Sequence, residues 1–407
     1  MRASIVGFGL FWTGLLIGPS GCAPQVISLF EQSKMLALAK PVAAPREWQP
    51  DAVVDFSTPQ LNALIAAGVQ ASGGLKKTYK RRLLFQDAAV RTSFEIQNVD
   101  LKPSNRCNSC FTVALALQGN VRWALGARDG DVPVGAAISF DTEMLAHRHD
   151  ASWNVTAKLH DVKSLDLRWN SQDGALKPLL ETSLGEWLRE SLLRNASEVQ
   201  LGTFGSAEVP LRGFRLSPLT RGLRVEMLTE AVSPVSVMAS KEPPLEGFRV
   251  SVSADSIADL ARTMSFQQGA VGYDVVVEPT SMVFQGGKFD LAIRLWRPVG
   301  RGWWRDYVVH GAMALGAKGV VLTPKSIDEG AKSKGALWVD PLASLGEGFI
   351  LKTIETSVAT TLPLPDTTSG ALPIRLVLNN VMGDATMLVV NGRLDPVPPS
   401  ANPVPSR

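Results

Sequence analysis

The residues of this chain with the clearest chemical potential are its cysteines and histidines. Two of its three cysteines, Cys107 and Cys110, stand three apart between segments that alternate like strands. In an oxidising compartment this spacing predicts a small disulfide loop that stiffens a turn. Two alternatives stay open. A redox site is disfavoured because the pair precedes a strand and not a helix, and a zinc site would need two further ligands, such as His147 and His149.

The N-terminal segment, from Met1 to Cys22, has the pattern of an export signal. Arg2 supplies a positive charge, and residues 5–17 form an apolar core that is short for a membrane span. The residues that follow, Pro19-Ser20-Gly21-Cys22, resemble the lipobox of bacterial lipoproteins, with Pro19 where Leu is usual. Cleavage before Cys22 would leave a lipidated cysteine, and several acyl chains anchor a protein stably. We expect a lipoprotein signal peptide over residues 1–21, with an ordinary secretory signal as the alternative.

Signatures of catalysis are missing from the sequence. The chain has four histidines, and none belongs to a metalloprotease or hydrolase signature. We find no G-x-S-x-G, no phosphate-binding loop and no dinucleotide-binding fingerprint, and the carboxylates stand mostly singly on the polar side of strand patterns. We therefore expect a protein that is not an enzyme and that uses no cofactor and no metal.

Two features favour contact with a membrane. The first is a basic run that suits anionic headgroups, made of Lys76, Lys77, Lys80, Arg81 and Arg82. The second is a turn bordered by arginines and by Trp303 and Trp304, residue types that gather at membrane interfaces. The alternatives are a solvated loop for the basic run and packing within a hairpin for the tryptophans.

Composition limits the class of protein. With 407 residues, the chain is long enough for two or three domains. Its charged fraction of 19% and mean hydropathy of +0.08 make it more apolar than usual for a soluble protein. No segment after the N-terminus is long and apolar enough to span a membrane, and a net charge of +3 does not indicate a nucleic-acid partner. We infer an unusually large apolar interior.

Long alternating strands are expected to surround that interior. From Phe111 to Leu125, seven apolar residues share one parity. About 15 residues at about 3.3 Å each span roughly 50 Å, and a strand of that length must twist and coil around something. A change of parity between Ile96 and Val99 predicts a bulge in the preceding strand.

Helices with one apolar face flank these strands. Ser57 and Gln60 form a capping box, and the helix they open carries the stripe Leu61, Leu64 and Ile65. A longer helix over residues 175–195 is expected to carry Leu180, Leu184 and Leu188 on one face.

The same order then recurs. Ser253 caps a helix with Ile257 and Leu260, at an offset of 196 from Ser57 (253 − 57). The letters of 183–186 recur at 344–347, an offset of 161, in a predicted helix that carries Leu345 and Phe349. Pro210 matches Pro373 at an offset of 163. We interpret this as a duplication whose second copy is about 35 residues shorter (196 − 161), the difference lying in the strands between the helices.

This order of capped helix, long meander, long helix and closing strand resembles the tubular lipid-binding superfamily, which includes the bactericidal permeability-increasing and lipopolysaccharide-binding proteins. The openings Phe56–Leu64 and Val252–Ile257 look like the start of that family's repeat. The resemblance implies an α+β protein of two tandem domains, each a long, highly curved antiparallel sheet wrapped around a long amphipathic helix. Animal members tie a strand to a helix with a disulfide, and no cysteine pair here is placed to do so.

We divide the chain accordingly. Residues 1–21 are the signal peptide, 22–50 a tether, 51–228 the first tubular lipid-binding domain, 229–247 a linker, 248–396 the second such domain and 397–407 a Pro-rich tail. Apolar residues within the tether, among them Phe30 and Leu36, leave a short docking helix as the alternative.

The expected function is that of an exported, membrane-anchored lipoprotein that binds, and is able to transfer, a lipid or lipid-like molecule in an apolar tunnel. The tunnel would be lined by Leu61, Leu64, Ile65, Leu180, Leu184, Leu188, Ile257, Leu260, Leu345 and Phe349. Ala23 stands where an Asp would retain a lipoprotein at the inner membrane, which favours the periplasmic face of the outer membrane in the cell envelope. The alternative is a structural or assembly lipoprotein that binds another envelope protein through solid-cored domains.

Overall fold

The structure is a computed structural model, and it describes residues 25–39, 48–71, 76–83, 86–107, 109–125, 128–150, 152–169, 182, 185–186, 188–190, 198–205, 210–231, 236–237, 240–271, 273–300, 302–316, 319–333 and 374–396. Over these residues the chain is mostly antiparallel β-sheet with few helices. None of the helices in this part of the chain has the length and apolarity that crossing a bilayer requires.

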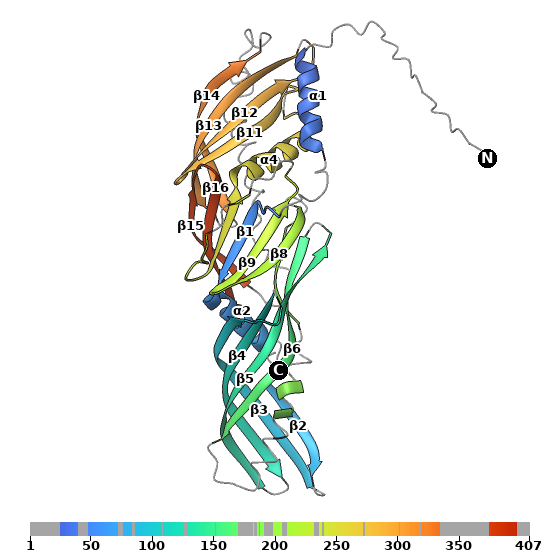
Figure 1. Cartoon of the computed structure of the whole chain (residues 1–407), viewed down its shortest axis with the longest axis vertical. Helices are drawn as coiled ribbons and strands as arrows, with labels where there is room; N and C mark the ends of the chain where they lie inside the picture. The colour runs from blue at the N-terminus through green and yellow to red at the C-terminus, as the bar shows by residue number, and fades with distance from the viewer. Residues whose placement is uncertain are drawn as a thin grey trace, which may run out of the picture.

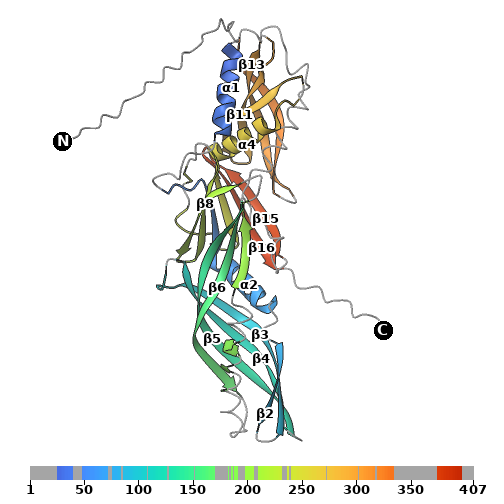
Figure 2. The ribbon, with the colours of Figure 1, turned by 90° about the vertical axis from the view of Figure 1, so that its right-hand side faces the viewer.

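Three sheets follow one another along an elongated molecule (Figures 1 and 2). The first end sheet has the order β2 (Lys76–Leu83), β3 (Gln86–Pro103), β4 (Cys110–Leu125), β5 (Arg128–His149), β6 (Ser152–Trp169) and β7 (Glu198–Phe204). The central sheet has the order β15 (Ile374–Gly383), β16 (Met387–Pro396), β10 (Phe248–Ser253), β1 (Ala52–Ser57), β9 (Gly222–Thr229) and β8 (Leu211–Leu219). The second end sheet has the order β11 (Val276–Gln285), β12 (Lys288–Arg297), β13 (Trp303–Leu315) and β14 (Val320–Lys332).

The central sheet joins the two halves of the chain. β1 and β10 pair antiparallel at its middle, where Phe56 lies opposite Phe248. The hairpin of β8 and β9 extends the sheet on one side, and the hairpin of β15 and β16 extends it on the other. Pairing the first strand of each half leaves neither with an open edge. The expectation of two separate tandem domains is therefore not confirmed, because strands of both share one sheet.

The order of elements repeats as the sequence predicts. In the first half β1 leads through helix α2 (Thr58–Ala71) and the first end sheet to β8 and β9. In the second half β10 leads through helix α4 (Ala254–Gln268) and the second end sheet to β15 and β16. β10 begins at an offset of 196 from the start of β1 (248 − 52), and β15 begins at an offset of 163 from the start of β8 (374 − 211). The second end sheet has four strands and the first has six. The second copy is thus shorter in the strands between its helices, as the sequence predicts.

The first end sheet is curled into a half-barrel (Figure 1). Along β4 the apolar residues of one parity, from Phe111 to Val121, are buried, while Gly119 and the residues of the other parity are exposed or half-buried. The ladder of β3 with β4 shifts register between Ile96 and Asn98, which confirms the predicted bulge. Bulges of this kind bend a strand and increase its twist, so the sheet closes part of the way around its apolar face.

The cap at Ser253 forms as predicted, because its hydroxyl accepts the Ser256 backbone N–H, whereas the start of α2 forms only half of the predicted capping box. The Ser57 hydroxyl accepts the Gln60 backbone N–H at 3.2 Å, as expected. The Gln60 side chain does not return to Ser57, because the Ser57 N–H already donates to the carbonyl of Gly247. Instead Gln60 Nε2 donates to the Leu394 carbonyl at 2.8 Å, and its Oε1 accepts the Leu394 N–H at 3.0 Å. The helix of one half is thereby tied to a strand of the other.

Part of the predicted tether forms helix α1 (Gln25–Leu38), which packs against α4 and the second end sheet (Figure 1). Phe30 is buried between Phe266 of α4 and Trp296 of β12, with ring centroids 5.8 Å apart in both pairs. The prediction of a tether is therefore wrong for these residues, which form the docking helix given as the alternative. Burial of an aromatic side chain is the physical reason, since it stabilises the docked state.

Candidate lipid-binding interior

One apolar interior runs through all three sheets. One connected cluster of buried apolar residues includes Leu115 in the first end sheet, Val54 and Val250 in the central sheet, and Ile293 in the second end sheet. The inward-facing residues alternate with outward-facing ones on β4 and β12, as one-sided burial requires. The interior therefore extends along the molecule and is not divided into one core per half.

Five of the predicted lining residues lie in this interior. Leu61, Leu64 and Ile65 come from α2, Leu188 from the helical residues 188–190, and Ile257 from α4. All five side chains are at most 4% exposed. α2 and α4 thus each direct an apolar stripe inward from the two ends of the central sheet.

Leu260 does not join the others. It is buried against Ala231 in a separate small cluster, so its assignment to the lining is corrected. Leu260 lies three positions after Ile257 and so about 60° from it around the helix, at the edge of the stripe where it meets Ala231 in the segment after β9. Leu180, Leu184, Leu345 and Phe349 lie outside the described residues.

Two buried carboxylates lie in the central sheet, and both are satisfied. Asp51 is fully buried and accepts the Thr229 N–H at 2.8 Å and the Thr229 hydroxyl. Burial raises the pKa of Asp51 above 3.8, although the hydrogen bonds from Thr229 oppose the shift. Asp55 forms a two-pronged pair with Arg224 at 2.7 and 3.1 Å. Because their partners are protein groups, these acids offer no free charge to a ligand.

The predicted membrane contacts fall at opposite ends of the molecule. The basic run lies on β2, an outer strand of the first end sheet, whereas Trp303 and Trp304 open β13 beside α1 (Figure 1). Trp303 is 5% exposed and packs in the main interior, so its assignment to a membrane surface is corrected. Trp304 is half-buried, and the Arg294 guanidinium lies 4.3 Å from its ring centroid. Adjacent strand residues point to opposite faces, which sends one tryptophan inward.

Cys107 and Cys110 form a disulfide in the connection between β3 and β4. Both sulfurs are occupied by that bond, which removes the zinc alternative that would have used them as thiolates. Cys22 lies outside the described residues.

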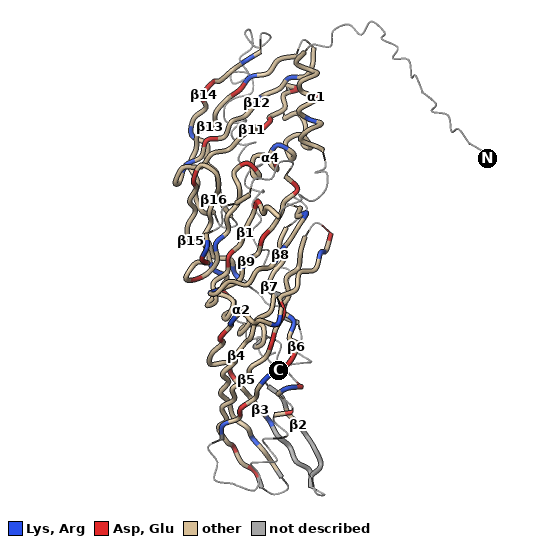
Figure 3. Tube along the Cα trace, viewed as in Figure 1, with Lys and Arg blue, Asp and Glu red and all other residues tan. Residues whose placement is uncertain are grey.

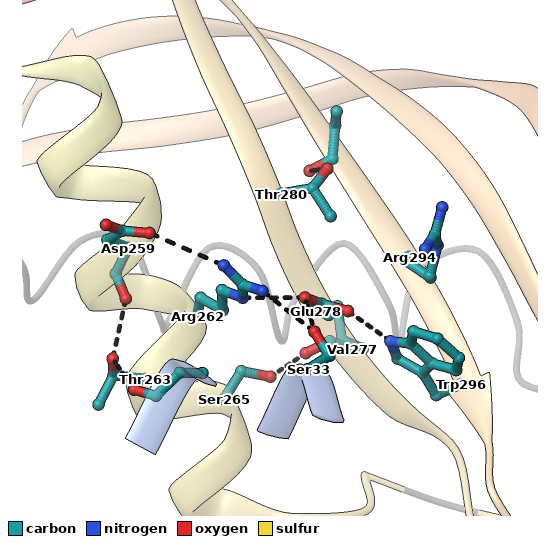
Figure 4. A network of polar contacts seen from close by, with 12 residues as sticks. Ser33, Asp259, Arg262, Thr263, Ser265, Val277, Glu278, Thr280, Arg294 and Trp296 are labelled. Atoms are coloured by element: carbon teal, nitrogen blue, oxygen red, sulfur yellow. Dashed lines mark hydrogen bonds and ion pairs between the residues drawn. The ribbon is translucent and has the colours of Figure 1, made fainter. Parts of the chain in front are cut away.

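A polar network on the outer face of the second end sheet holds α1 in place (Figure 4). The Glu278 side chain is 3% exposed and accepts hydrogen bonds from Ser33 Oγ and Trp296 Nε1. Arg262 Nη2 donates to Ser33 Oγ at 3.0 Å. Arg262 Nε lies 2.9 Å from Glu278 Oε1 as an ion pair, although its N–H lacks the direction of a hydrogen bond. Nothing in the sequence near Ser33 indicates these partners, since Glu278 is 245 residues away.

A cavity of about 370 Å³ adjoins this network, and its lining includes Ser33, Arg262, Glu278, Arg294 and Asp306. Arg294 is held by Asp306 at 2.6 and 2.9 Å, and that hydrogen bonding raises the pKa of Arg294. A wall of paired charges disfavours an acyl chain, because burying charge beside hydrocarbon costs free energy. The apolar interior, and not this cavity, is the candidate lipid site.

Taken together, the fold and the site define an elongated protein of curled antiparallel sheets around one apolar interior. No family model and no curated protein matches the sequence. A crystal structure of lipopolysaccharide binding protein is similar at 13% identity over 86% of this chain and 100% of that chain, with a TM-score of 0.43. P47 from Clostridium botulinum A2 is similar at 10% identity over 84% and 97% of the two chains, with a TM-score of 0.33. P47 of Clostridium botulinum E1 is similar at 10% identity over 85% and 99%, with a TM-score of 0.36.

Proposed function

We propose that this protein is an envelope lipoprotein that holds the acyl chains of a lipid or lipid-like molecule in its apolar interior and leaves the headgroup outside. Binding would consist of moving hydrocarbon out of water, at about 0.8 kcal/mol per methylene. A chain of about 15 methylenes would contribute roughly 12 kcal/mol before the costs of ordering it. No covalent step is involved, and release to a second membrane would amount to transfer.

The continuity of the interior is the observation that supports this proposal. An ordinary domain needs one compact core, whereas here a single apolar cluster passes from Leu115 through Val54 to Ile293 across three sheets. A continuous apolar interior of that kind offers hydrocarbon surroundings along its whole course. The anchor at Cys22 and the periplasmic face of the outer membrane belong to the same proposal and rest on the sequence of the leader.

A solid-cored structural lipoprotein is the second candidate. Leu188, Val113 and Leu291 are each 0% exposed, so protein atoms already cover them in the structure. Such close packing is typical of a solid protein core, which needs no ligand to fill it. The partner of such a protein would be another envelope protein.

Extraction of bound lipid separates these candidates. The full-length protein is purified from membranes, washed in detergent and extracted with organic solvent, and the lipid is counted by mass spectrometry. The matched variants are Leu64→Trp, which fills the interior, and Val283→Trp, which adds the same side chain at an exposed position. We expect about one or more lipids per chain in the wild type and in Val283→Trp, and several-fold less in Leu64→Trp. A wild-type protein that releases no lipid and takes up no labelled lipid would exclude the tunnel.

A further inference from the structure

Helix α1 has a second face that the fold leaves uncovered. With about 100° between successive residues of a helix, Phe30 and Ala37 point toward the body of the protein, where both are buried. The face that points away from the body carries Met35 and Leu36, with Leu29 at its edge, and these side chains are 66%, 54% and 40% exposed.

That outward face has no charge. Between its three apolar side chains lie Ser28 and Gln32. Figure 3 colours the charged positions along the chain. On α1 these are Glu31, which lies about 40° beyond Met35 at the border of this face, and Lys34, which lies about 100° beyond Met35. The exposed side of a docked surface helix normally carries charged residues. A helix that packs on one face and carries exposed apolar side chains without charge on another is suited to being covered on both.

Exposed apolar side chains concentrate at this end of the molecule. Among the described residues nine large apolar side chains are exposed, and five of them lie on α1 or in the turn between β12 and β13: Leu29, Met35, Leu36, Leu38 and Val299. The turn adjoins the helix, because a Cβ on Gly302 would lie 3.2 Å from the Val26 side chain. Scattered apolar residues need no explanation, but a cluster of them marks an interaction surface.

The predicted anchor lies beside this surface. Cys22 precedes the first residue of α1 by three positions, and an extended chain spans at most about 3.6 Å per residue. The lipidated cysteine would therefore lie within about 11 Å of Gln25. Because Phe30, Ser33 and the buried Glu278 fix α1 to the body, a bilayer that holds the acyl chains must come close to the helix.

We propose that the outward face of α1, together with the Val299 turn, rests on the bilayer surface as an interfacial helix. Such helices place their apolar side chains at the boundary of headgroups and acyl chains. The second end sheet is then the part of the molecule nearest the anchor, whereas β2 belongs to the opposite end (Figure 1). This inference rests on the lipid anchor proposed above and is independent of whether the interior holds lipid.

Site-specific fluorescence tests this arrangement. Leu36→Cys and, as the control at the far end, Thr78→Cys are labelled with a fluorophore in the acylated full-length protein, whose other two described cysteines are in a disulfide. The proteins are reconstituted in vesicles of phosphatidylethanolamine and phosphatidylglycerol that contain headgroup-spin-labelled lipid. We expect several-fold stronger quenching at position 36 than at position 78, which is exposed on β2. Equal quenching at the two positions would overturn the proposal.

Substitution provides a second test that does not depend on a label. In a chain that begins at residue 22 and carries Cys22→Ser, and so has neither the apolar leader nor acyl chains, the pair Leu29→Gln and Leu36→Gln should lower vesicle binding about tenfold, because two leucines leave the interface. The matched control pair is Val283→Gln and Met382→Gln, at positions 43% and 48% exposed on β11 and β15, and it should change binding less than twofold. Equal losses in both pairs contradict the assignment. A position-36 label shielded from aqueous iodide but not quenched by spin-labelled lipid would contradict it too, and would assign the face to a protein or to a second copy.

Extraction of lipid, as described above, distinguishes failure of this inference from failure of the lipid-binding function. A protein that contains lipid but shows no quenching at position 36 refutes only the membrane contact. A protein that is quenched there but contains no lipid refutes only the tunnel.

Discussion

Loss of the Glu278 carboxylate should release α1 from the second end sheet while the rest of the fold persists. The change Glu278→Gln removes the negative charge that accepts from Ser33 and Trp296 and faces Arg262 across 2.9 Å. Breaking a fully buried ion pair costs about 3–5 kcal/mol. Arg262 is 25% exposed and also lies 3.9 Å from Asp259, so water and a second acid compensate part of that cost, and we expect about 2–3 kcal/mol.

Hydrogen exchange of the α1 amides measures this directly. A loss of about 2–3 kcal/mol from the docked state corresponds to exchange roughly 30- to 150-fold faster, confined to α1 and the facing turn of α4. Asp306→Asn is the matched control, because Asp306 pairs with Arg294 on the same outer face and is not part of the network that holds Ser33. If the exchange rate of the α1 amides in Glu278→Gln stayed within threefold of the wild type, or rose equally in the first end sheet, the role of Glu278 in holding α1 would be refuted.

Three further predictions concern groups outside that network. Hydrogen bonding to Asp290, and to a lesser extent to Asp328, raises the pKa of His310 above 6.5. The stabilisation from these hydrogen bonds is therefore complete below pH 6.5 and is lost as the pH rises through the raised pKa of the folded state. NMR titration should show a lower pKa of His310 in Asp290→Asn, and an unchanged pKa would contradict this. Burial raises the pKa of Asp51 above 3.8, so the folded state favours the protonated acid, and the stability of the wild type relative to Asp51→Asn should decline as the pH climbs from 3.8. Urea unfolding of both proteins at several pH values checks this, and a difference independent of pH would count against it. Gln60→Ala should cost about 2–4 kcal/mol, because it leaves the N–H and carbonyl of Leu394 without partners; a loss below about 1 kcal/mol in urea unfolding would show that water replaces the amide.

Local elements of this fold could be predicted from the sequence because their signals are local. The caps at Ser57 and Ser253, the alternation along β4 and the bulge after Ile96 each depend on neighbours within a few residues. The duplication was equally visible, since the offsets of 196 and 163 compare positions along the chain. Pro210 marks the start of β8 for the same reason.

Long-range pairing left no such signal. β1 is buried along its whole length, so its sequence has no polar face that would show which strand lies beside it. The partners of Phe30 are Phe266 and Trp296, which belong to the second half of the chain, and only the fold brings them together. The error at Trp303 was avoidable, because two adjacent residues of one strand cannot share a face.

Photo-crosslinking would locate an acyl chain held within the interior. A phospholipid with a diazirine near the end of its acyl chain is incorporated into vesicles with the full-length protein, irradiated, and mapped by peptide mass spectrometry. We expect adducts on inward-facing residues such as Leu64, Leu115 and Ile257. We expect none on the outward residues of β4 that flank Leu115, Ala114 and Ala116. Adducts confined to α1 and the Val299 turn would show an apolar surface on a membrane and would contradict a lipid held inside.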